Sequence, residues 1–279
     1  MKSKAYLLIL TVITAFTIGG CGEKPESRIH VTATTTMMQS AIREIGGEKV
    51  SVSVLIPPGS CPGHYDIRPG DIQNIKKSRA LFIHGYEQFI PRLMESVGEP
   101  HPRVCRVPVE GNWMIPATYK ESCCKVALLL SGINPGNKEY YRSRLISLSK
   151  SVDETDRDIQ QRIKDTGACG TAVICSNQQA PLLEWMGLNV AGTYGRPDEF
   201  TPAQLHKLVL AGRKKNVSLV ADNLQSGPDA GVQLAKEIGA SHVTLSNFPG
   251  GFANTSTWKE CLLKNAELML SALSSTQEK

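Results

Sequence analysis

The fold is decided by KEYYRSRLISLSKSVDETDRDIQQRIKD, residues 138–165. This stretch contains no Gly or Pro, and its apolar residues recur at spacings of three, four or seven, which is typical of one apolar stripe on a continuous helix. At about 1.5 Å per residue, the helix would be on the order of 42 Å long. A helical hairpin would need a central turn and a coiled coil would need more heptads. We therefore predict one spine helix that runs along two lobes.

Strand and helix patterns alternate on both sides of this helix. Strands are predicted at residues 30–34, 50–56 and 80–84 before it, and at residues 171–176, 188–194, 217–222 and 242–245 after it. Helical patterns separate the strands, and this order predicts parallel sheets with helices on their faces. We therefore expect an α/β fold of two parallel-sheet lobes, joined by a long rigid spine helix, with a ligand cleft between the lobes.

The N-terminus predicts export and a lipid anchor. Lys2 and Lys4 precede an apolar run at residues 7–18 that is too short to span a bilayer. The run ends in Ile18-Gly19-Gly20-Cys21, which resembles the lipobox of bacterial lipoproteins, where the Cys is acylated and becomes the first mature residue. An ordinary secretory signal with a stray Cys is the alternative. We expect an extracytoplasmic protein anchored to the cell membrane, or in the periplasm, by a lipid on Cys21.

These patterns give the expected domain boundaries. They are a signal peptide at 1–20, a tether at 21–27, an N-terminal lobe at 28–137, the spine helix at 138–166 and a C-terminal lobe at 167–279. Hydrophobic residues are 41% and charged residues 20%, the balance of a folded body. The net charge of +5 is mild, and no basic stripe is interleaved with aromatic residues, so we expect no nucleic-acid partner.

The cysteines leave three interpretations open. The chain has eight, and lipidation of Cys21 would leave seven, an odd number that cannot pair completely within the chain. Partial disulfides, an anaerobic habitat and thiolate ligands each account for them in an exported protein.

Candidate site residues follow the predicted strands, because ligands of open parallel sheets bind at the carboxyl ends of strands. A loop rich in Pro and Gly, residues 57–64, carries Cys61 and His64. The candidates after later strands are Asn177, Asp198, Glu199, Asp222 and Asn247. His84 also ends an apolar strand, and we interpret it as a core histidine. No Gly-rich phosphate loop follows a strand and no G-x-S-x-G occurs, so we do not expect an enzyme.

The first loop and its surroundings resemble a known family. Residues 31–35, 55–59 and 63–72 are similar to the zinc/manganese-binding (cluster A-I, TroA-like) lipoproteins of ABC importers, which carry P-P-G-x-x-P-H-x-Y-E-P-x-P-x-D-I. The resemblance continues at residues 216–222 and 230–239 and covers nearly all of residues 28–275. It implies two α/β lobes, a spine helix that restricts hinge opening, and release of the ligand by loop movement and small lobe shifts.

Several family ligands are replaced in this chain. By the motif, His64 falls on the first metal-binding His of the family, with Gly63 inserted before it. The second His position, before Asn112 and Trp113, holds Gly111, and the third falls on Asn177. The positions that remain by this alignment are Asp222, often Glu in the family, and Asn247 for the late acidic ligand, with Asp198 and Glu199 in a loop where manganese binders place an acid.

The residues themselves suggest a metal set. His64 offers an imidazole, Cys61 three residues earlier a thiolate, Asp222 a carboxylate and Asn177 an amide oxygen. A thiolate favours zinc, copper(I) or ferrous iron over manganese. Each residue also has a structural interpretation: a hydrogen-bonded loop His, a half-buried thiol, a capping Asp and a polar cleft group.

Together these observations predict a solute-binding lipoprotein that captures a transition-metal ion, zinc in preference to manganese, and delivers it to an ABC importer. The resemblance implies a permease and an ATPase as partners, and we expect a monomer attached to the membrane by its lipid. The alternative is the same scaffold with a non-metal or chelated small ligand, because three expected ligands are absent.

Overall fold

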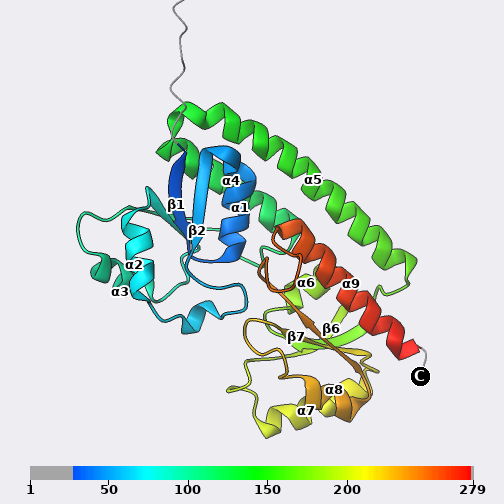
Figure 1. Ribbon diagram of the computed structural model, residues 1–279. Helices are drawn as coiled ribbons and strands as arrows, with labels where there is room; N and C mark the ends of the chain where they lie inside the picture. Colours follow the sequence, from blue (N-terminus) through cyan, green and yellow to red (C-terminus); the bar gives the residue numbers. More distant parts are fainter. Residues whose placement is uncertain (1–27, 278–279) are drawn as a thin grey trace, which may run out of the picture.

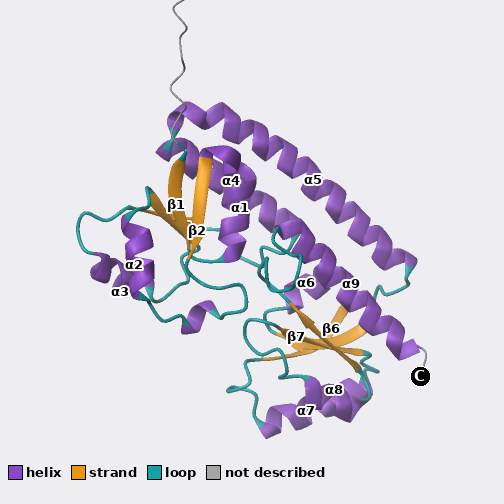
Figure 2. Ribbon diagram, in the orientation of Figure 1, coloured by secondary structure: helices purple, strands orange, loops and turns teal. Residues whose placement is uncertain are grey.

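The computed structural model describes residues 28–277, so the predicted signal peptide, the tether and Cys21 lie outside the described residues. The chain forms two α/β lobes with a long helix along one side (Figure 1). Each lobe contains one four-stranded sheet in which all strands are parallel (Figure 2). The predicted α/β fold with two parallel-sheet lobes is confirmed.

The N-terminal sheet has the strand order β2-β1-β3-β4. Its strands are β1 (Ile29–Ala33), β2 (Val50–Val54), β3 (Ala80–Ile83) and β4 (Arg103–Arg106). Its helices are α1 (Thr36–Gly46), α2 (Pro69–Lys76), α3 (Ile90–Val97) and α4 (Pro116–Ile133), with short 3-10 turns η1 (Gly47–Lys49), η2 (Pro62–His64) and η3 (Pro135–Asn137). Strand β4 is not predicted from the sequence, because it has only two apolar residues, which stand between Arg103 and Arg106, and only Cys105 is buried.

The C-terminal sheet repeats this arrangement with the order β6-β5-β7-β8. Its strands are β5 (Ala172–Ser176), β6 (Asn189–Tyr194), β7 (Leu219–Asn223) and β8 (Ser241–Leu245), and its helices are α6 (Ala180–Trp185), α7 (Pro202–Lys214), α8 (Val232–Ile238) and α9 (Trp258–Gln277). Helix α7 begins with a capping box, in which Thr201 Oγ1 accepts from the Gln204 backbone N–H and the Gln204 side chain accepts from the Thr201 backbone N–H.

The spine helix is α5 (Lys138–Asp165), which matches the helix predicted for this stretch. It packs on α1 and α4 of the N-terminal lobe and on α9, which follows the last strand of the C-terminal lobe. Its buried side chains are Tyr141, Val152, Thr155, Ile159 and Ile163, which lie at helical spacings along one face. The same helix is therefore fixed to elements from both lobes (Figure 1).

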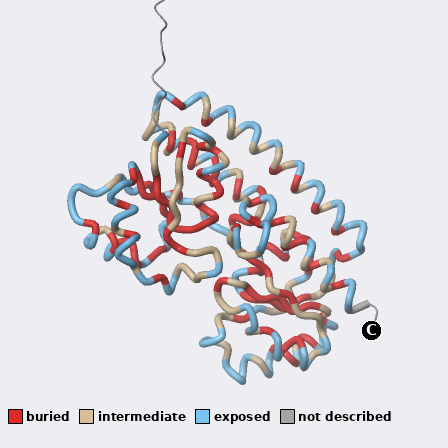
Figure 3. The backbone as a smooth tube through the Cα atoms, viewed as in Figure 1, coloured by how far each residue is buried: buried red, intermediate tan, exposed pale blue. Residues whose placement is uncertain are grey.

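The largest apolar core extends through both lobes without interruption. It joins Val31 and Tyr119 of the first lobe to Val173 and Leu219 of the second, with Trp258 among its members. Buried segments accordingly continue from one lobe into the other in Figure 3. Smaller clusters fill the other face of each sheet, under α2 and α3 and under α7 and α8. The lobes are therefore held by a shared core as well as by α5.

Among residues 28–277, no helix combines the length and the apolar character that crossing a membrane requires.

Candidate functional site

A cavity of about 570 Å³ lies between the lobes, at the carboxyl ends of strands from both sheets. The segments after β3 and β4 form one wall, and the segments after β5 and β8 form the other. The lining residues are Met37, His84, Gly85, Tyr86, Arg106, Pro108, Val109, Glu110, Gly111, Asn112, Trp113, Asn177, Gln178, Pro181, Asn247 and Phe248. This is the place where parallel sheets bind ligands. Four predicted candidates therefore line one cavity: Gly111, Asn112, Asn177 and Asn247.

Three residues join the lobes across this cavity, and we call Asn112, Gln178 and Asn247 the amide bridge. Asn112 Nδ2 donates to Asn247 Oδ1 at 3.0 Å and to the Gln178 carbonyl oxygen at 3.2 Å. Asn247 Nδ2 donates to the same carbonyl oxygen at 3.1 Å. Asn112 Oδ1 is occupied as well, because it accepts from the Met114 backbone N–H at 2.8 Å. The two asparagine side chains and the Gln178 carbonyl oxygen satisfy one another and link the lobes without any charged group.

Position 111, where the family resemblance expects a second metal-binding His, holds a glycine for a conformational reason. Gly111 has φ +93°, a backbone conformation that favours glycine. A Cβ here would meet nothing closer than Thr118, at 3.9 Å, so space is available and the backbone conformation is the obstacle. A His at position 111 would therefore be strained in this loop.

His64 lies in η2 and faces the C-terminal lobe, where it contacts Arg196 in the loop after β6. Arg196 Nη1 lies 2.7 Å from His64 Nε2, and Nη2 lies 2.9 Å from Nδ1. A neutral imidazole has only one acceptor nitrogen, so at most one of these contacts is a hydrogen bond at a time. The guanidinium thus occupies the atoms that the predicted metal ligand would use.

The two predicted acids of that loop, Asp198 and Glu199, both contact Arg196. Asp198 Oδ1 lies 3.2 Å from Arg196 Nε, and Glu199 Oε2 accepts from the Arg196 backbone N–H at 3.2 Å. Cys61, three residues before His64, is a half-buried free thiol. The same loop crosses to the other lobe through the Pro58 carbonyl oxygen, which accepts from Gln225 Nε2 at 2.7 Å.

Asp222 does not line the cavity, because its side chain lies on the α8 face of β7. Alternation along the strand places Val220 and Asp222 on this face and Ala221 on the other. Its fully buried carboxylate accepts from Tyr194 Oη at 2.6 Å and from the Gly231 backbone N–H at 2.9 Å, and it lies 2.6 Å from His242 Nε2. Burial, and then the charge of Asp222, raise the pKa of Tyr194, so the phenol remains a donor.

His84 is the cavity residue whose role sequence reasoning missed. It is only 8% exposed, as expected for a core histidine, but it also lines the cavity, where its ring packs edge-on against Trp113 at 4.4 Å. Its Nε2 lies 2.8 Å from Thr35 Oγ1. The signal for this role was its position, directly after the apolar strand β3 and before Gly85.

Burial sets the charge of this histidine. It lowers the pKa of His84 to about 4, although the Glu87 carboxylate acts in the opposite direction, so the imidazole is neutral near pH 7. For Glu87, burial raises the pKa, but His84, the Thr34 hydroxyl at 2.5 Å and the N–H groups of His84 and Gly85 outweigh it and leave the pKa lowered. The cavity wall therefore presents an uncharged imidazole supported by a carboxylate.

The described residues contain no group of three or more His, Cys, Asp or Glu side chains that could hold a metal ion. The structure brings His64 to Arg196, and it brings Asn112 to Asn247, but it makes no cluster of His64, Cys61, Asn177 and Asp222. As it stands, the cavity offers amides, one neutral imidazole, the Glu110 carboxylate, the Arg106 guanidinium and aromatic rings. These groups recognise a ligand by hydrogen bonds and stacking more readily than they enclose a bare ion.

Comparison with known proteins gives consistent relatives. The sequence model of one family, described as ZnuA, zinc-uptake complex component A, periplasmic, matches residues 31–272. The manganese-binding lipoprotein MntA of Halalkalibacterium halodurans is 20% identical over 98% of this chain and 100% of the relative. The high-affinity zinc uptake system protein ZnuA of Bacillus subtilis is 22% identical over 88% of this chain and 86% of the relative.

Solved structures share the fold. A crystal structure of ZnuA superposes with a TM-score of 0.74 at 18% identity, over 88% of this chain and 100% of the other. The substrate-binding protein FpvC of P. aeruginosa, in complex with Ni²⁺, also gives a TM-score of 0.74, at 20% identity, over 90% of this chain and 98% of the other. At these identities the likeness shows the two-lobed fold.

Proposed function

The chain belongs to the family of the periplasmic component A of zinc-uptake complexes, and from this premise we propose that it captures a transition-metal ion outside the cytoplasm and hands it to an ABC importer. The observation that carries the proposal is the family match over residues 31–272, on a fold whose cavity opens between the two lobes. The family is a transport family, and its substrate-binding proteins work with a permease and an ATPase. We propose zinc ahead of manganese as the cargo, a monomeric receptor, and anchorage through Cys21.

His64 is the proposed protein ligand of the metal, and its capture requires an exchange. An arginine keeps its proton at any physiological pH, so a guanidinium and a metal cation compete for the same imidazole nitrogen. The metal must therefore displace the Arg196 guanidinium from His64. The contact of Arg196 with Asp198 can hold the guanidinium once it has left the imidazole. Cys61 and Asn177 are the next proposed ligands, one a soft thiolate and the other an amide oxygen. Asp222 stays a prediction, and its contacts with Tyr194 and His242 would have to change.

A second candidate cargo is a metal ion carried by a small chelating molecule. It is favoured by the chemistry of the cavity, whose 570 Å³ lie in the range of small-molecule sites and exceed the needs of a bare ion. Arg106 supplies a positive charge for carboxylates of a chelator, and Asn177 and Tyr86 supply neutral polar groups. In this arrangement the chelator would provide most of the metal ligands that the protein lacks.

Metal binding by the mature chain tests the proposal. The chain from residue 22 is purified without added metal, its bound elements are measured, and zinc, manganese, iron and copper are titrated by calorimetry. We expect zinc to bind more tightly than about micromolar, and His64→Ala to weaken it at least tenfold, which is about 1.4 kcal/mol. The matched control is His101→Ala, an exposed imidazole in the same lobe, which should leave the affinity unchanged.

The other variants separate the proposed ligands from structural residues. If the thiolate coordinates the metal, Cys61→Ser should weaken zinc binding more than manganese binding. An unchanged zinc affinity would show that Cys61 is not a ligand. Asp222→Asn keeps the shape of the side chain, so a loss of affinity without a loss of stability would make Asp222 a ligand. If no free metal binds but zinc in citrate does, the chelate is the cargo. If neither binds, the receptor proposal is wrong.

A further inference from the structure

Every strand of the N-terminal sheet begins at a basic residue. Arg28 directly precedes β1, Lys49 precedes β2, Arg79 precedes β3, and Arg103 is the first residue of β4. Because the strands are parallel, their first residues lie along the same side of the sheet, which we call its N-terminal edge. The cations are gathered at this edge, and the cavity lies at the opposite side, where the strands end. The starts of β5 to β8 in the other lobe follow Thr171, Leu188, Ser218 and Ala240, none of which is charged.

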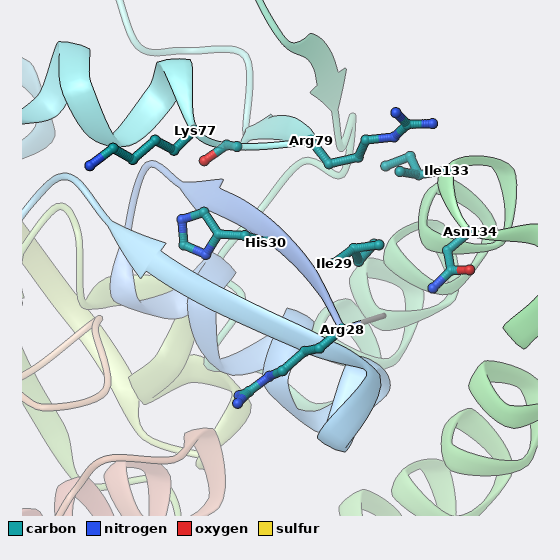
Figure 4. Close-up of a pocket in the computed structure, with 8 residues that line it drawn as sticks. Arg28, Ile29, His30, Lys77, Arg79, Ile133 and Asn134 are labelled. Atoms are coloured by element: carbon teal, nitrogen blue, oxygen red, sulfur yellow. The ribbon is translucent and has the colours of Figure 1, made fainter. Parts of the chain in front are cut away.

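Two neighbouring open hollows at this edge are lined by cations. One, of about 580 Å³, is shown in Figure 4, with Arg28, Lys77 and Arg79 around His30. The other, of about 450 Å³, shares Ser78, Arg79 and Ile133 with it. We call the five lysines and arginines that line the two hollows the basic edge: Arg28, Lys76, Lys77, Arg79 and Arg103. Among the described residues no Asp or Glu lines either hollow, so the Lys and Arg charges that line them are all positive and have no acid among them.

These charges are not neutralised by the protein. All five side chains are exposed, and within the described chain none of them forms an ion pair. Two acids near these cations in the sequence already have other partners: Asp71 accepts from Tyr65 Oη and from the Arg68 backbone N–H, both at 2.7 Å, and Glu99 lies 3.1 Å from His101. Lysines and arginines without an acidic partner at the rim of a hollow are suited to bind phosphate. One guanidinium group can donate two parallel hydrogen bonds to two oxygens of the same phosphate.

The position of the proposed lipid acceptor identifies a source of phosphate. Arg28 is the first described residue, and the proposed lipid acceptor Cys21 lies seven residues before it. Seven residues span at most about 25 Å, so a lipid on Cys21 would keep the basic edge next to the bilayer surface. We propose that the basic edge binds the headgroups of anionic phospholipids and so orients the anchored receptor. The N-terminal edge of the sheet then faces the membrane, and the cavity at its other edge stays open to cargo.

Vesicle binding of the non-lipidated chain tests this surface separately from the metal site. The chain beginning at residue 21 carries Cys21→Ser, so that no lipid is added, and it keeps both lobes. It is mixed with vesicles of phosphatidylcholine alone or with an equal part of phosphatidylglycerol, and bound protein is recovered by flotation. We expect binding only to the anionic vesicles, and we expect it to fall as salt is raised, because counterions screen the attraction.

The decisive variant removes three charges from the basic edge. Arg28→Gln, Arg79→Gln and Arg103→Gln together should weaken binding to anionic vesicles roughly tenfold to a hundredfold. The matched control makes the same charge change on exposed lysines of the other lobe, Lys207→Gln, Lys214→Gln and Lys236→Gln, and should keep most of the binding. Replacement of the three arginines by Lys should restore it.

Three results would overturn the proposal. The first is an equal loss of vesicle binding in the lysine control variant, which would make net charge alone responsible. The second is equal binding of the parent chain to vesicles of phosphatidylcholine alone. The third is release from the vesicles by inorganic phosphate where chloride of the same ionic strength releases nothing, which would indicate a site for soluble phosphate. Zinc titration and the unfolding midpoint of each variant show that the fold is intact. If the arginine variant does not fold, Lys76→Gln with Lys77→Gln at the end of α2 gives the same test.

Discussion

The ring of Trp258, at the start of α9, stacks on the ring of Tyr119 in α4, with centroids 4.5 Å apart and planes only 2° from parallel. Trp258 is 2% exposed, and its Nε1 donates to the Trp113 carbonyl oxygen at 2.8 Å. Its backbone N–H donates to Ser40 Oγ in α1 at 3.0 Å. The Trp258 side chain from α9 thus packs against residues of the N-terminal lobe and forms part of the shared core.

Removal of this contact should destabilise both lobes. We expect Trp258→Ala to lower the free energy of unfolding by about 3–5 kcal/mol, since it empties a large buried volume. Trp258→Phe should cost less, about 1–3 kcal/mol, because it keeps a ring but leaves the Trp113 carbonyl oxygen without its donor. Urea unfolding followed by circular dichroism measures both. Leu128→Ala, at an exposed position, is the control, and a change below 1 kcal/mol for Trp258→Ala would contradict the shared core.

Arg196 should act against metal capture. Arg196→Gln removes the competing guanidinium from His64, so we expect the affinity for zinc to rise about three- to tenfold, the worth of one hydrogen bond. Calorimetric titration measures the change. Arg213→Gln, which loses only a hydrogen bond to a carbonyl oxygen of the C-terminal lobe, should leave zinc affinity as it is. A lower affinity in Arg196→Gln would show that Arg196 supports the site instead.

The amide bridge should contribute measurably to closure of the lobes. Asn112→Ala removes two donated hydrogen bonds and the acceptor for the Met114 N–H. We expect a loss of about 1–2 kcal/mol in the free energy of unfolding, limited by the partial exposure of the site. Amide hydrogen exchange should rise at Met114 and near Asn247. The same substitution at an exposed amide, Gln233→Ala, provides the comparison, and unchanged exchange at Met114 would argue against the bridge.

Stability should fall in mild acid because of His84. Its pKa is about 4 in the folded protein against 6.5 for an ordinary histidine, so between these values the unfolded chain binds a proton that the folded chain does not. Unfolding is favoured as the pH falls through this window, by up to about 3 kcal/mol, at 1.36 kcal/mol per pKa unit. The lowered pKa of Glu87 acts in the same direction as the pH falls below the ordinary glutamate range.

Urea unfolding at pH 7 and pH 5 checks this dependence. In His84→Gln the difference in stability between the two pH values should shrink, because the group that binds the extra proton on unfolding is gone. His101→Gln, at an exposed position, should keep the difference of the parent chain. An equal pH dependence in His84→Gln and the parent would assign the effect to other groups.

Much of the fold is readable in the sequence because its periodicities are long. Residues 138–165 repeat one apolar face over 28 residues, and β5 and β7 contain the apolar runs Ala172–Cys175 and Leu219–Ala221. Strand β4 escaped prediction because Arg103 and Arg106 bracket two residues and no run exists. A short strand of this kind is fixed by its neighbour, here β3, and not by its own composition.

The site was less predictable than the fold. The rule that ligands bind at strand ends selected Asn177 and Asn247, and the family resemblance pointed to Gly111 and Asn112. All four line one cavity. It does not determine which face of the sheet a strand-end residue takes, and Asp222 took the face under α8. Nor does sequence reveal the partner of a loop residue such as His64, because Arg196 is 132 positions away.

The amide bridge has a consequence for the surroundings in which such a receptor works. Outside the cytoplasm the acidity and the ionic strength follow the medium, and carboxylate or imidazole contacts would loosen or tighten with them. Asn112, Gln178 and Asn247 do not titrate and carry no net charge, so their mutual hydrogen bonds keep the same strength in acid, in neutral solution and in brine. This part of the contact between the two lobes therefore does not depend on the acidity or the salt of the medium.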